Sequence, residues 1–239
     1  MKTSTKLVVA SMVLALVMLA CYNYSLKAEY KLGKYKDRFN MHTFVKASGI
    51  TGLRVNAIDL INVRVETGAK EGLWIKTELK DKIKVAVNGD QLVLSWIGKD
   101  KDDPASYYGS DVILIANQLN TVAVNAYFNV IEKRFSWQGK GLVELVGISG
   151  AKMDMDIGEY CGIEMVSTNF DRVSAKIGSD TVGATLSVDR ASGMGKGYFD
   201  IPGPGELKCS AWKINESKFK VTKLATVSIT GRLAQHLNN

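Results

Sequence analysis

Seven short runs of alternating residues follow one another between Asn117 and Gly231. They are Val122-Ala-Val124, Val143-Glu-Leu145, Met153-Asp-Met-Asp-Ile157, Ile163-Glu-Met-Val166, Ala184-Thr-Leu-Ser-Val188, Leu207-Lys-Cys-Ser-Ala211 and Val227-Ser-Ile229. Alternation with a period of two places successive side chains on opposite faces of a β-strand. The stretch contains no apolar pattern of helical length. It therefore predicts an all-β body.

One apolar residue per run recurs at a nearly constant interval. The steps are 21, 21, 20, 21 and 20 residues along the series Val124, Leu145, Val166, Leu186, Leu207 and Val227. A fixed period of this size is typical of repeat architectures, in which each unit buries its apolar side chains against its neighbours. The sequence therefore predicts a right-handed β-solenoid, or β-helix-like body, in this region.

The residues before this stretch predict a hairpin region. Ile83-Lys-Val-Ala-Val87 and Leu92-Val-Leu-Ser-Trp96 alternate on either side of Asn88-Gly89. Asn-Gly between two alternating runs is the strongest short-range signal of a β-hairpin. The polar residues 99–110 predict a long loop. We expect one β-domain over residues 39–231, followed by a C-terminal tail at 232–239.

The basic residues are concentrated at the N-terminus. The chain of 239 residues has a formal net charge of +7, from 31 basic and 24 acidic residues. Residues 1–38 hold 7 of the bases and 2 of the acids, a balance of +5, so the remainder has 24 − 22 = +2. A nearly neutral body lacks the one-sided basic surface that nucleic-acid binding requires. We therefore expect no nucleic-acid partner.

Residues 1–24 predict one N-terminal membrane-anchor or signal helix. Lys2 and Lys6 precede an uncharged run, which is 18 residues long when counted from Leu7 to Tyr24. That length lies at the short end of what spans a bilayer, and the layout is also that of a secretory signal. An uncleaved anchor, a lipoprotein signal acylated at Cys21 and a cleaved secretory signal are all compatible with the residues.

Each of these interpretations exports the body from the cytoplasm. The lipoprotein alternative rests on Met18-Leu-Ala-Cys21, in which small Ala20 precedes the cysteine. Residues 25–38 are a basic linker that either lies on anionic lipid headgroups or forms a solvated stalk. We expect the membrane to be a partner through the N-terminal segment. The predicted location is the cell envelope, periplasmic or at the surface.

Several stretches of the body resemble the GIN family, the auto-transporter adhesin head domains of bacterial envelope proteins. They are Phe44-Val-Lys-Ala-Ser-Gly-Ile50, Val63-Arg-Val-Glu-Thr-Gly68, the hairpin around Asn88-Gly89, and residues 147–156. The resemblance covers residues 39–231 and implies a β-solenoid-like body in the envelope. The family has no established catalytic mechanism, so the resemblance implies no catalytic residues. The sequence departs from the family's glycine- and serine-rich turns at Asn125-Ala-Tyr-Phe128.

The search for chemistry finds no catalytic or metal motif. His42 and His236 have no Cys, Asp or Glu at metal-ligand spacing. Asp154 and Asp156 share one face of a strand, but two carboxylates supply too few oxygens for calcium. We therefore predict that they face solvent while Met153 and Met155 fill the core, and we expect no cofactor, no metal and no catalytic residue.

Four aromatic residues are the candidate binding residues. Tyr107 and Tyr108 lie in the polar loop, where they should be accessible. Phe135 and Trp137 share one strand face, where aromatic side chains stack on sugar rings if they point outward and fill the core if they point inward. The predicted function is a non-enzymatic, membrane-tethered envelope module, adhesin-like in binding or scaffolding a polysaccharide or an envelope protein. The alternative is a carbohydrate-active enzyme, a polysaccharide lyase or hydrolase, built on a β-helix.

Overall fold

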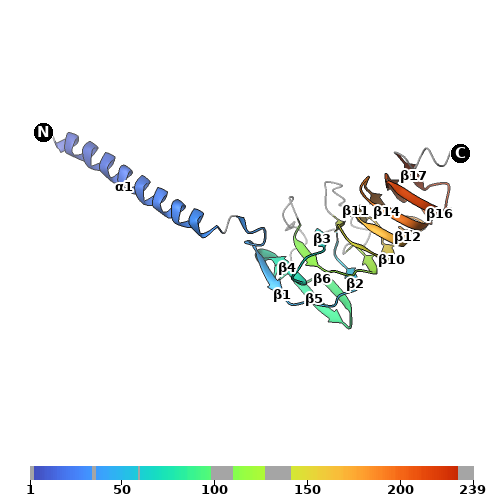
Figure 1. The fold of residues 1–239 in the computed structure, drawn as a ribbon. Coiled ribbons are helices and arrows are strands. Elements are labelled where there is room, and N and C mark those ends of the chain that lie inside the picture. Colours follow the sequence, from blue (N-terminus) through green and yellow to red (C-terminus); the bar gives the residue numbers. More distant parts are fainter. Residues whose placement is uncertain (1–2, 34–35, 59, 98–109, 127–140, 231–239) are drawn as a thin grey trace. The chain divides into compact units, whose positions relative to one another are not determined.

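The computed structural model describes residues 3–33, 36–58, 60–97, 110–126 and 141–230. The chain divides into two compact units, Met1–His42 and Thr43–Asn239. The first contains helix α1 (Thr3–Leu32), which is longer than the predicted helix of residues 1–24. We call the second unit the β body (Figure 1).

Helix α1 is the one helix among the described residues that is long and apolar enough to cross a membrane. Its segment Thr5–Leu32 has a mean hydropathy of 2.1, and none of it is buried within the structure. An apolar helix without a protein surface to cover it is the form that a membrane span or a signal sequence takes.

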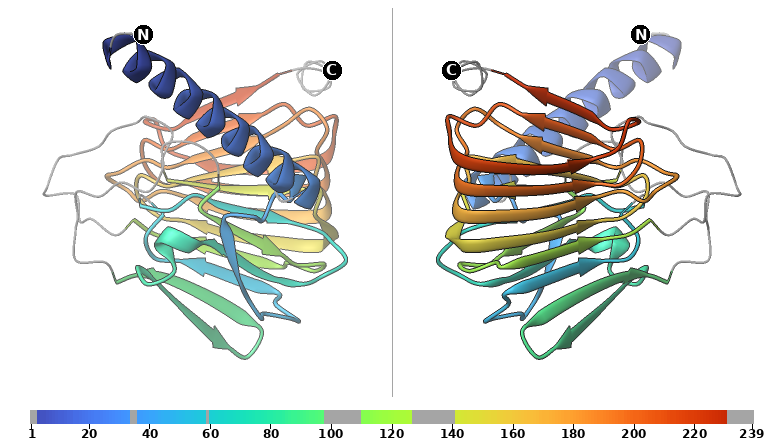
Figure 2. Two further views of the ribbon diagram at one scale, coloured as in Figure 1. Left: turned by 90° about the vertical axis from the view of Figure 1, so that its left-hand side faces the viewer. Right: turned by 90° about the vertical axis from the view of Figure 1, so that its right-hand side faces the viewer.

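The strands of the β body form two large sheets, which Figure 2 shows from two sides. Sheet A has nine strands in the order β1-β4-β7-β3-β9-β11-β13-β15-β17, and sheet B has eight in the order β16-β14-β12-β10-β8-β2-β6-β5. The bounds in sheet A are β1 His42–Val45, β3 Val63–Glu66, β4 Gly72–Lys76, β7 Val112–Ile115, β9 Leu142–Val146, β11 Gly162–Val166, β13 Thr185–Val188, β15 Glu206–Cys209 and β17 Thr226–Ile229. Those in sheet B are β2 Gly52–Val55, β5 Ile83–Asn88, β6 Gln91–Trp96, β8 Thr121–Val124, β10 Ser149–Ile157, β12 Asn169–Ile177, β14 Gly193–Ile201 and β16 Lys213–Val221.

The prediction of a right-handed β-solenoid is wrong. The two sheets are open rather than closed, and each mixes parallel with antiparallel pairs. Strand β4 runs antiparallel to β7 in sheet A, and β5 runs antiparallel to β6 in sheet B. Two open sheets that enclose one core make a fold like a β-sandwich.

The period of about 20 residues has a different cause from the one predicted. Each repeat adds one strand to sheet A and one to sheet B, and successive strands of one sheet pair in parallel from β9 to β17 and from β8 to β16. Leu186, Leu207 and Val227 do share one row of sheet A. Val124 belongs to sheet B instead, and Val166 pairs with Val146 in the neighbouring row.

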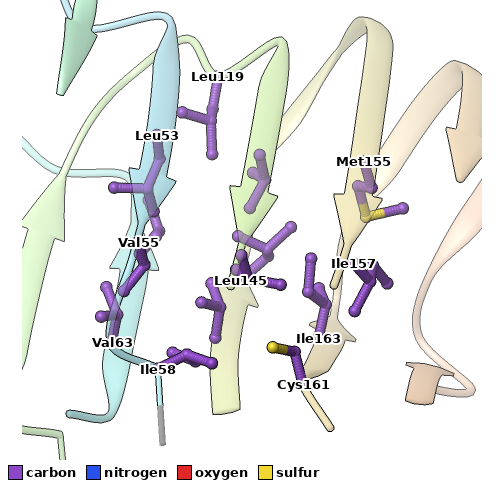
Figure 3. Close-up of a cluster of buried hydrophobic side chains, with 14 of the residues drawn as sticks. Leu53, Val55, Ile58, Val63, Leu119, Leu145, Met155, Ile157, Cys161 and Ile163 are labelled. Atoms are coloured by element: carbon purple, nitrogen blue, oxygen red, sulfur yellow. The ribbon is translucent and has the colours of Figure 1, made fainter. Parts of the chain in front are cut away.

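Side chains from the inner faces of both sheets meet in one core (Figure 3). Leu53, Val55, Met155 and Ile157 come from sheet B, while Val63, Leu145 and Ile163 come from sheet A. Met153 and Met155 are buried as predicted, with Asp156 exposed on the other face. Alternation along each strand therefore assigns the core correctly, although the repeat was assigned to the wrong architecture.

The predicted hairpin is confirmed. Strands β5 and β6 pair antiparallel, with Asn88 opposite Gln91. The two-residue loop between them begins at Gly89, whose φ is +65°. Glycine reaches this left-handed conformation without a steric penalty, which allows the tight turn.

Two ion pairs join strands that are distant in the sequence. Arg64 Nη1 donates to Glu144 Oε2 at 2.5 Å, which links β3 to β9, and its Nε donates to Glu66 at 3.1 Å. Burial alone would lower the pKa of Arg64, but the hydrogen bonds and charges of Glu66 and Glu144 raise it overall. Lys76 on β4 donates to Asp111, which is buried, at 2.8 Å.

Candidate functional site

A groove of about 660 Å³ crosses the outer face of sheet B. Its lining comes from seven neighbouring strands, from β6 to β16. Neighbouring strands lie about 4.8 Å apart, so six steps give a length of roughly 29 Å. The groove therefore has the shape to hold an extended chain that runs across the strands.

The parallel register builds the two sides of the groove. One side is the row Gln91, Thr121, Asp154, Ser174, Tyr198 and Lys218, and the other is the row Arg54, Ala123, Asp156, Lys176, Asp200 and Lys220. Between them lies the backbone of a row whose side chains point into the core, among them Met155, Ala175 and Phe199. Residues two apart on a strand are separated by about 6.8 Å, which sets the distance between the two sides.

Charges of both signs alternate along the second side. Asp156, Lys176, Asp200 and Lys220 follow one another on adjacent strands. Lys220 donates to Asp200 Oδ2 at 3.0 Å, whereas Asp200 Oδ1 is shielded from solvent and has no hydrogen-bond partner in the described part of the chain. The row therefore presents donors and acceptors in alternation at steps of one strand.

Tyr198 is the aromatic side chain on the first side of the groove. The guanidinium of Arg172 lies 4.9 Å from the centre of its ring, and Lys218 Nζ lies 5.9 Å from it. Cations at such distances are attracted to the face of an aromatic ring. These contacts orient the half-buried tyrosine on the sheet, where its hydroxyl group adds a polar contact to the charged rows.

The sequence-based candidates had mixed outcomes. Tyr107, Tyr108, Phe135 and Trp137 lie outside the described residues, so they remain predictions. Asp154 and Asp156 point away from the core, as expected from the alternation, and both line the groove. Lys152 pairs with Asp154 through its ammonium group.

Sequence reasoning missed that a second carboxylate lies in phase with Asp156. Asp200 lies in the same row, two strands away. The step from Asp156 to Lys176 is 20 residues, but that from Lys176 to Asp200 is 24. A search at a constant interval passes over Asp200, because the turn between β12 and β14 is longer than its neighbours. Counting alternating positions within each strand, rather than from repeat to repeat, would have found it.

The cysteines offer no reactive site in the described β body. Cys161 and Cys209 are both buried as free thiols. Burial raises the pKa of Cys209, so its reactive thiolate form is disfavoured. Cys21 is exposed on helix α1. Within the described ranges, no three His, Cys, Asp or Glu residues are grouped so as to hold a metal ion.

The fold and the groove define a class of protein: a two-sheet β-domain with an extended polar groove on one open face, preceded by an apolar helix. No family model matches the chain, and no curated protein matches it. The similarity that exists is to solved structures, at a level that carries no argument about function.

Three such structures illustrate the similarity. A candidate lipid-binding protein from Parabacteroides distasonis is 12% identical with a TM-score of 0.43, over 80% of this chain and 94% of that chain. A candidate adhesin from Bacteroides fragilis is 13% identical with a TM-score of 0.39, over 79% and 96% of the two chains. A candidate adhesin from Parabacteroides merdae is 8% identical with a TM-score of 0.39, over 80% and 95%.

Proposed function

We propose that the protein is a non-enzymatic, membrane-tethered module of the cell envelope that binds a polysaccharide in the groove of sheet B. The observation that carries the proposal is the groove itself, with its alternating acidic and basic side chains along seven adjacent strands. The resemblance of the quoted stretches to the GIN family agrees with a head domain of this kind, and membership of that family is part of the proposal.

The chemistry of the lining favours a ligand with many hydroxyl groups. Carboxylates accept hydrogen bonds from hydroxyls, and ammonium groups donate to their oxygens. The groove holds four bases (Arg54, Lys176, Lys218 and Lys220) and three acids (Asp154, Asp156 and Asp200), so its charge is nearly balanced. A nearly neutral lining disfavours a strongly charged polymer, because every like charge in the ligand would face repulsion or a desolvation cost.

Removing one acid and one base from the centre of the groove tests this proposal. Asp156→Ala combined with Lys176→Ala deletes two neighbouring side chains from its second side. We expect the double variant to lose about tenfold or more in affinity, because truncating central polar contacts of an interface typically costs over 1 kcal/mol. The measurement is co-sedimentation of the full chain with peptidoglycan sacculi, together with affinity electrophoresis in dextran and in alginate.

Glu164→Ala combined with Lys208→Ala is the matched control. These residues also form part of an outward row, but on sheet A, with Ser187 between them. The control should bind as the wild type does. Equal losses in both double variants, or no retention of the wild type by any of the three polysaccharides, would contradict the proposal.

The same row supports a second candidate function, a polysaccharide hydrolase or lyase. Asp156 and Asp200 lie two strands apart, about 9.6 Å between backbones. Glycosidases that invert configuration place their two carboxyl groups roughly 6.5–9.5 Å apart. New reducing ends or unsaturated ends, released by the wild type and not by Asp200→Asn, would favour this function over binding alone.

We also propose that helix α1 is an uncleaved membrane anchor and that residues 25–38 link it to the β-domain. The length and hydropathy of Thr5–Leu32 support a span. The aromatic rings of Tyr22 and Tyr24 suit the interface between lipid and water. Basic residues that follow them would interact with anionic headgroups, each by about 1 kcal/mol.

Cys21→Ala distinguishes the anchor from a lipoprotein. For an uncleaved helix, the substitution should leave the protein in the membrane fraction after a carbonate wash. The intact mass of the wild type should include the residues before Cys21. A mature N-terminus at Cys21 with added acyl mass would show lipidation instead, and one within residues 22–30 would show cleavage and secretion.

A further inference from the structure

The end of the β body formed by β16 and β17 exposes apolar side chains that are buried one strand earlier. Phe219 is 38% exposed where its row neighbour Phe199 is 2% exposed. Val221 is 48% exposed against 0% for Ile201, and Val227 is 37% exposed against 0% for Leu207. The residue type is kept where burial is lost. Terminal units of stacked proteins normally become polar at such an end.

Both strands at this end also have a free edge. β16 is last in sheet B and β17 is last in sheet A, so each has one strand neighbour in the described part of the chain. A free edge presents backbone N–H and C=O groups that can pair with another strand. Exposed apolar side chains between two free edges form a surface that a matching pair of strands would complete. We call this surface the terminal face; its exposed apolar residues are Trp212, Phe219, Val221, Leu224 and Val227.

We propose that the terminal face binds the terminal face of a second copy of this chain, around a two-fold axis. A two-fold axis places identical surfaces against each other. Rotation about an axis perpendicular to both sheets sets β16 antiparallel to β16 of the partner subunit and β17 antiparallel to its counterpart. Both sheets then continue across the interface, and the apolar residues of the two terminal faces are buried together.

The charges on β16 select the register of this pairing. With Ser217 opposite Ser217 of the partner subunit, Glu216 lies opposite Lys218 of the partner subunit, and the reverse pair forms on the other side of the axis. A shift of the axis to Lys218 would place two lysines opposite each other, which is unfavourable on adjacent strands. β17 carries no charged residue that opposes the association. The surface therefore complements itself in shape, polarity and charge.

Reversing one charge tests the interface without changing the core. Glu216 and Lys218 are both outside the core, so Glu216→Lys should fold normally. We expect the full chain in detergent to be a dimer by light scattering coupled to size exclusion. Glu216→Lys should weaken the dimer about tenfold, because it replaces attraction by repulsion at both symmetric positions. Combining it with Lys218→Glu should restore the dimer, because the opposite charges again face each other.

A cysteine at the two-fold axis gives a second, independent measurement. Opposed residues of antiparallel strands have Cα atoms about 4.5–5.5 Å apart, within the range of a disulfide. Ser217→Cys should therefore crosslink to a dimer under mild oxidation, in a Cys21→Ala background that removes the exposed native thiol. Ser187→Cys, on the outer face of β13 in the middle of sheet A, should not crosslink.

Three results would overturn the proposal. The first is a monomeric wild type without crosslinking of Ser217→Cys. The second is a dimer that Glu216→Lys leaves unchanged. The third is a monomer that becomes a dimer only after removal of residues 231–239, since those residues would then be the cover of the terminal face.

Discussion

Leu186→Asp should lower the melting temperature of the β body by about 10 °C or more. Leu186 is 0% exposed on β13, between Ile163 and Leu207 on the neighbouring strands. An unpaired carboxylate in this position should cost about 4 kcal/mol or more, which is a large share of the stability of an ordinary domain. In a unit of this size, each 1 kcal/mol shifts the melting temperature by about 2–4 °C.

Ser187→Asp is the control for this variant. Ser187 is the next residue on the same strand and points to the opposite face, between Glu164 and Lys208. Its neighbours carry one charge of each sign, so the change in stability should stay within about 0.5 kcal/mol. The four tryptophans all lie in the β body, at positions 74, 96, 137 and 212, so their fluorescence follows its unfolding alone. If the two variants melt alike, the assignment of inner and outer faces is wrong.

Asp111→Ala should destabilise the β body by about 3–5 kcal/mol. The Asp111 carboxylate is 1% exposed, accepts from Lys76 Nζ at 2.8 Å and accepts from the Asn62 N–H at 2.9 Å. Removing it takes from a mostly buried ammonium group the carboxylate that faces it. It also removes the acceptor of a backbone N–H. The free energy of unfolding in urea, again followed by tryptophan fluorescence, is the quantity to compare.

Glu206→Ala provides the matching exposed pair. Glu206 pairs with Lys208 at 3.0 Å, but the lysine side chain is 55% exposed. Exposed pairs contribute about 0–1 kcal/mol, so this variant should lose little. A loss equal to that of Asp111→Ala would show that burial does not set the strength of the pair at Lys76. Replacing both Lys76 and Asp111 by apolar residues of similar volume should recover part of the stability.

The local structure of this chain could be predicted because it depends on neighbours in the sequence. The alternation around Met153 and Met155 assigned both to the core. Asn88-Gly89 located the hairpin of β5 and β6, because its residues tolerate the backbone conformation of a tight turn. The apolar run after Lys6 predicted a helix, since its composition alone makes a long uncovered apolar segment.

The architecture could not be predicted from the same patterns. Alternation states that a residue is inside or outside, but it does not state to which sheet its strand belongs. The series that began at Val124 therefore mixed a strand of sheet B with strands of sheet A. Parallel order in the N-terminal half is not sequential either, because β3 lies between β7 and β9.

The candidate site shows the same division. Asp154 and Asp156 were placed on an outer face by their alternation with the methionines. Their meeting with Asp200, Lys220 and Arg54 required the register of seven strands, including a repeat of 24 residues where the others have 20. The free ends at β16 and β17 could not be located either, because exposure of Phe219 and Val227 depends on which strand is last in each sheet.

The sequence by itself determined that the chain has an apolar helix followed by strands, and which side chains of those strands point into a core. These properties follow from the residues within one strand or one helix, through steric preference and the burial of apolar surface. The tertiary structure alone decided that the strands form two open mixed sheets, which charges share a row, and which apolar residues stay exposed at the terminal face. Those properties depend on hydrogen bonds between strands 20 to 80 residues apart, such as β3 with β9, and local patterns carry no information about them.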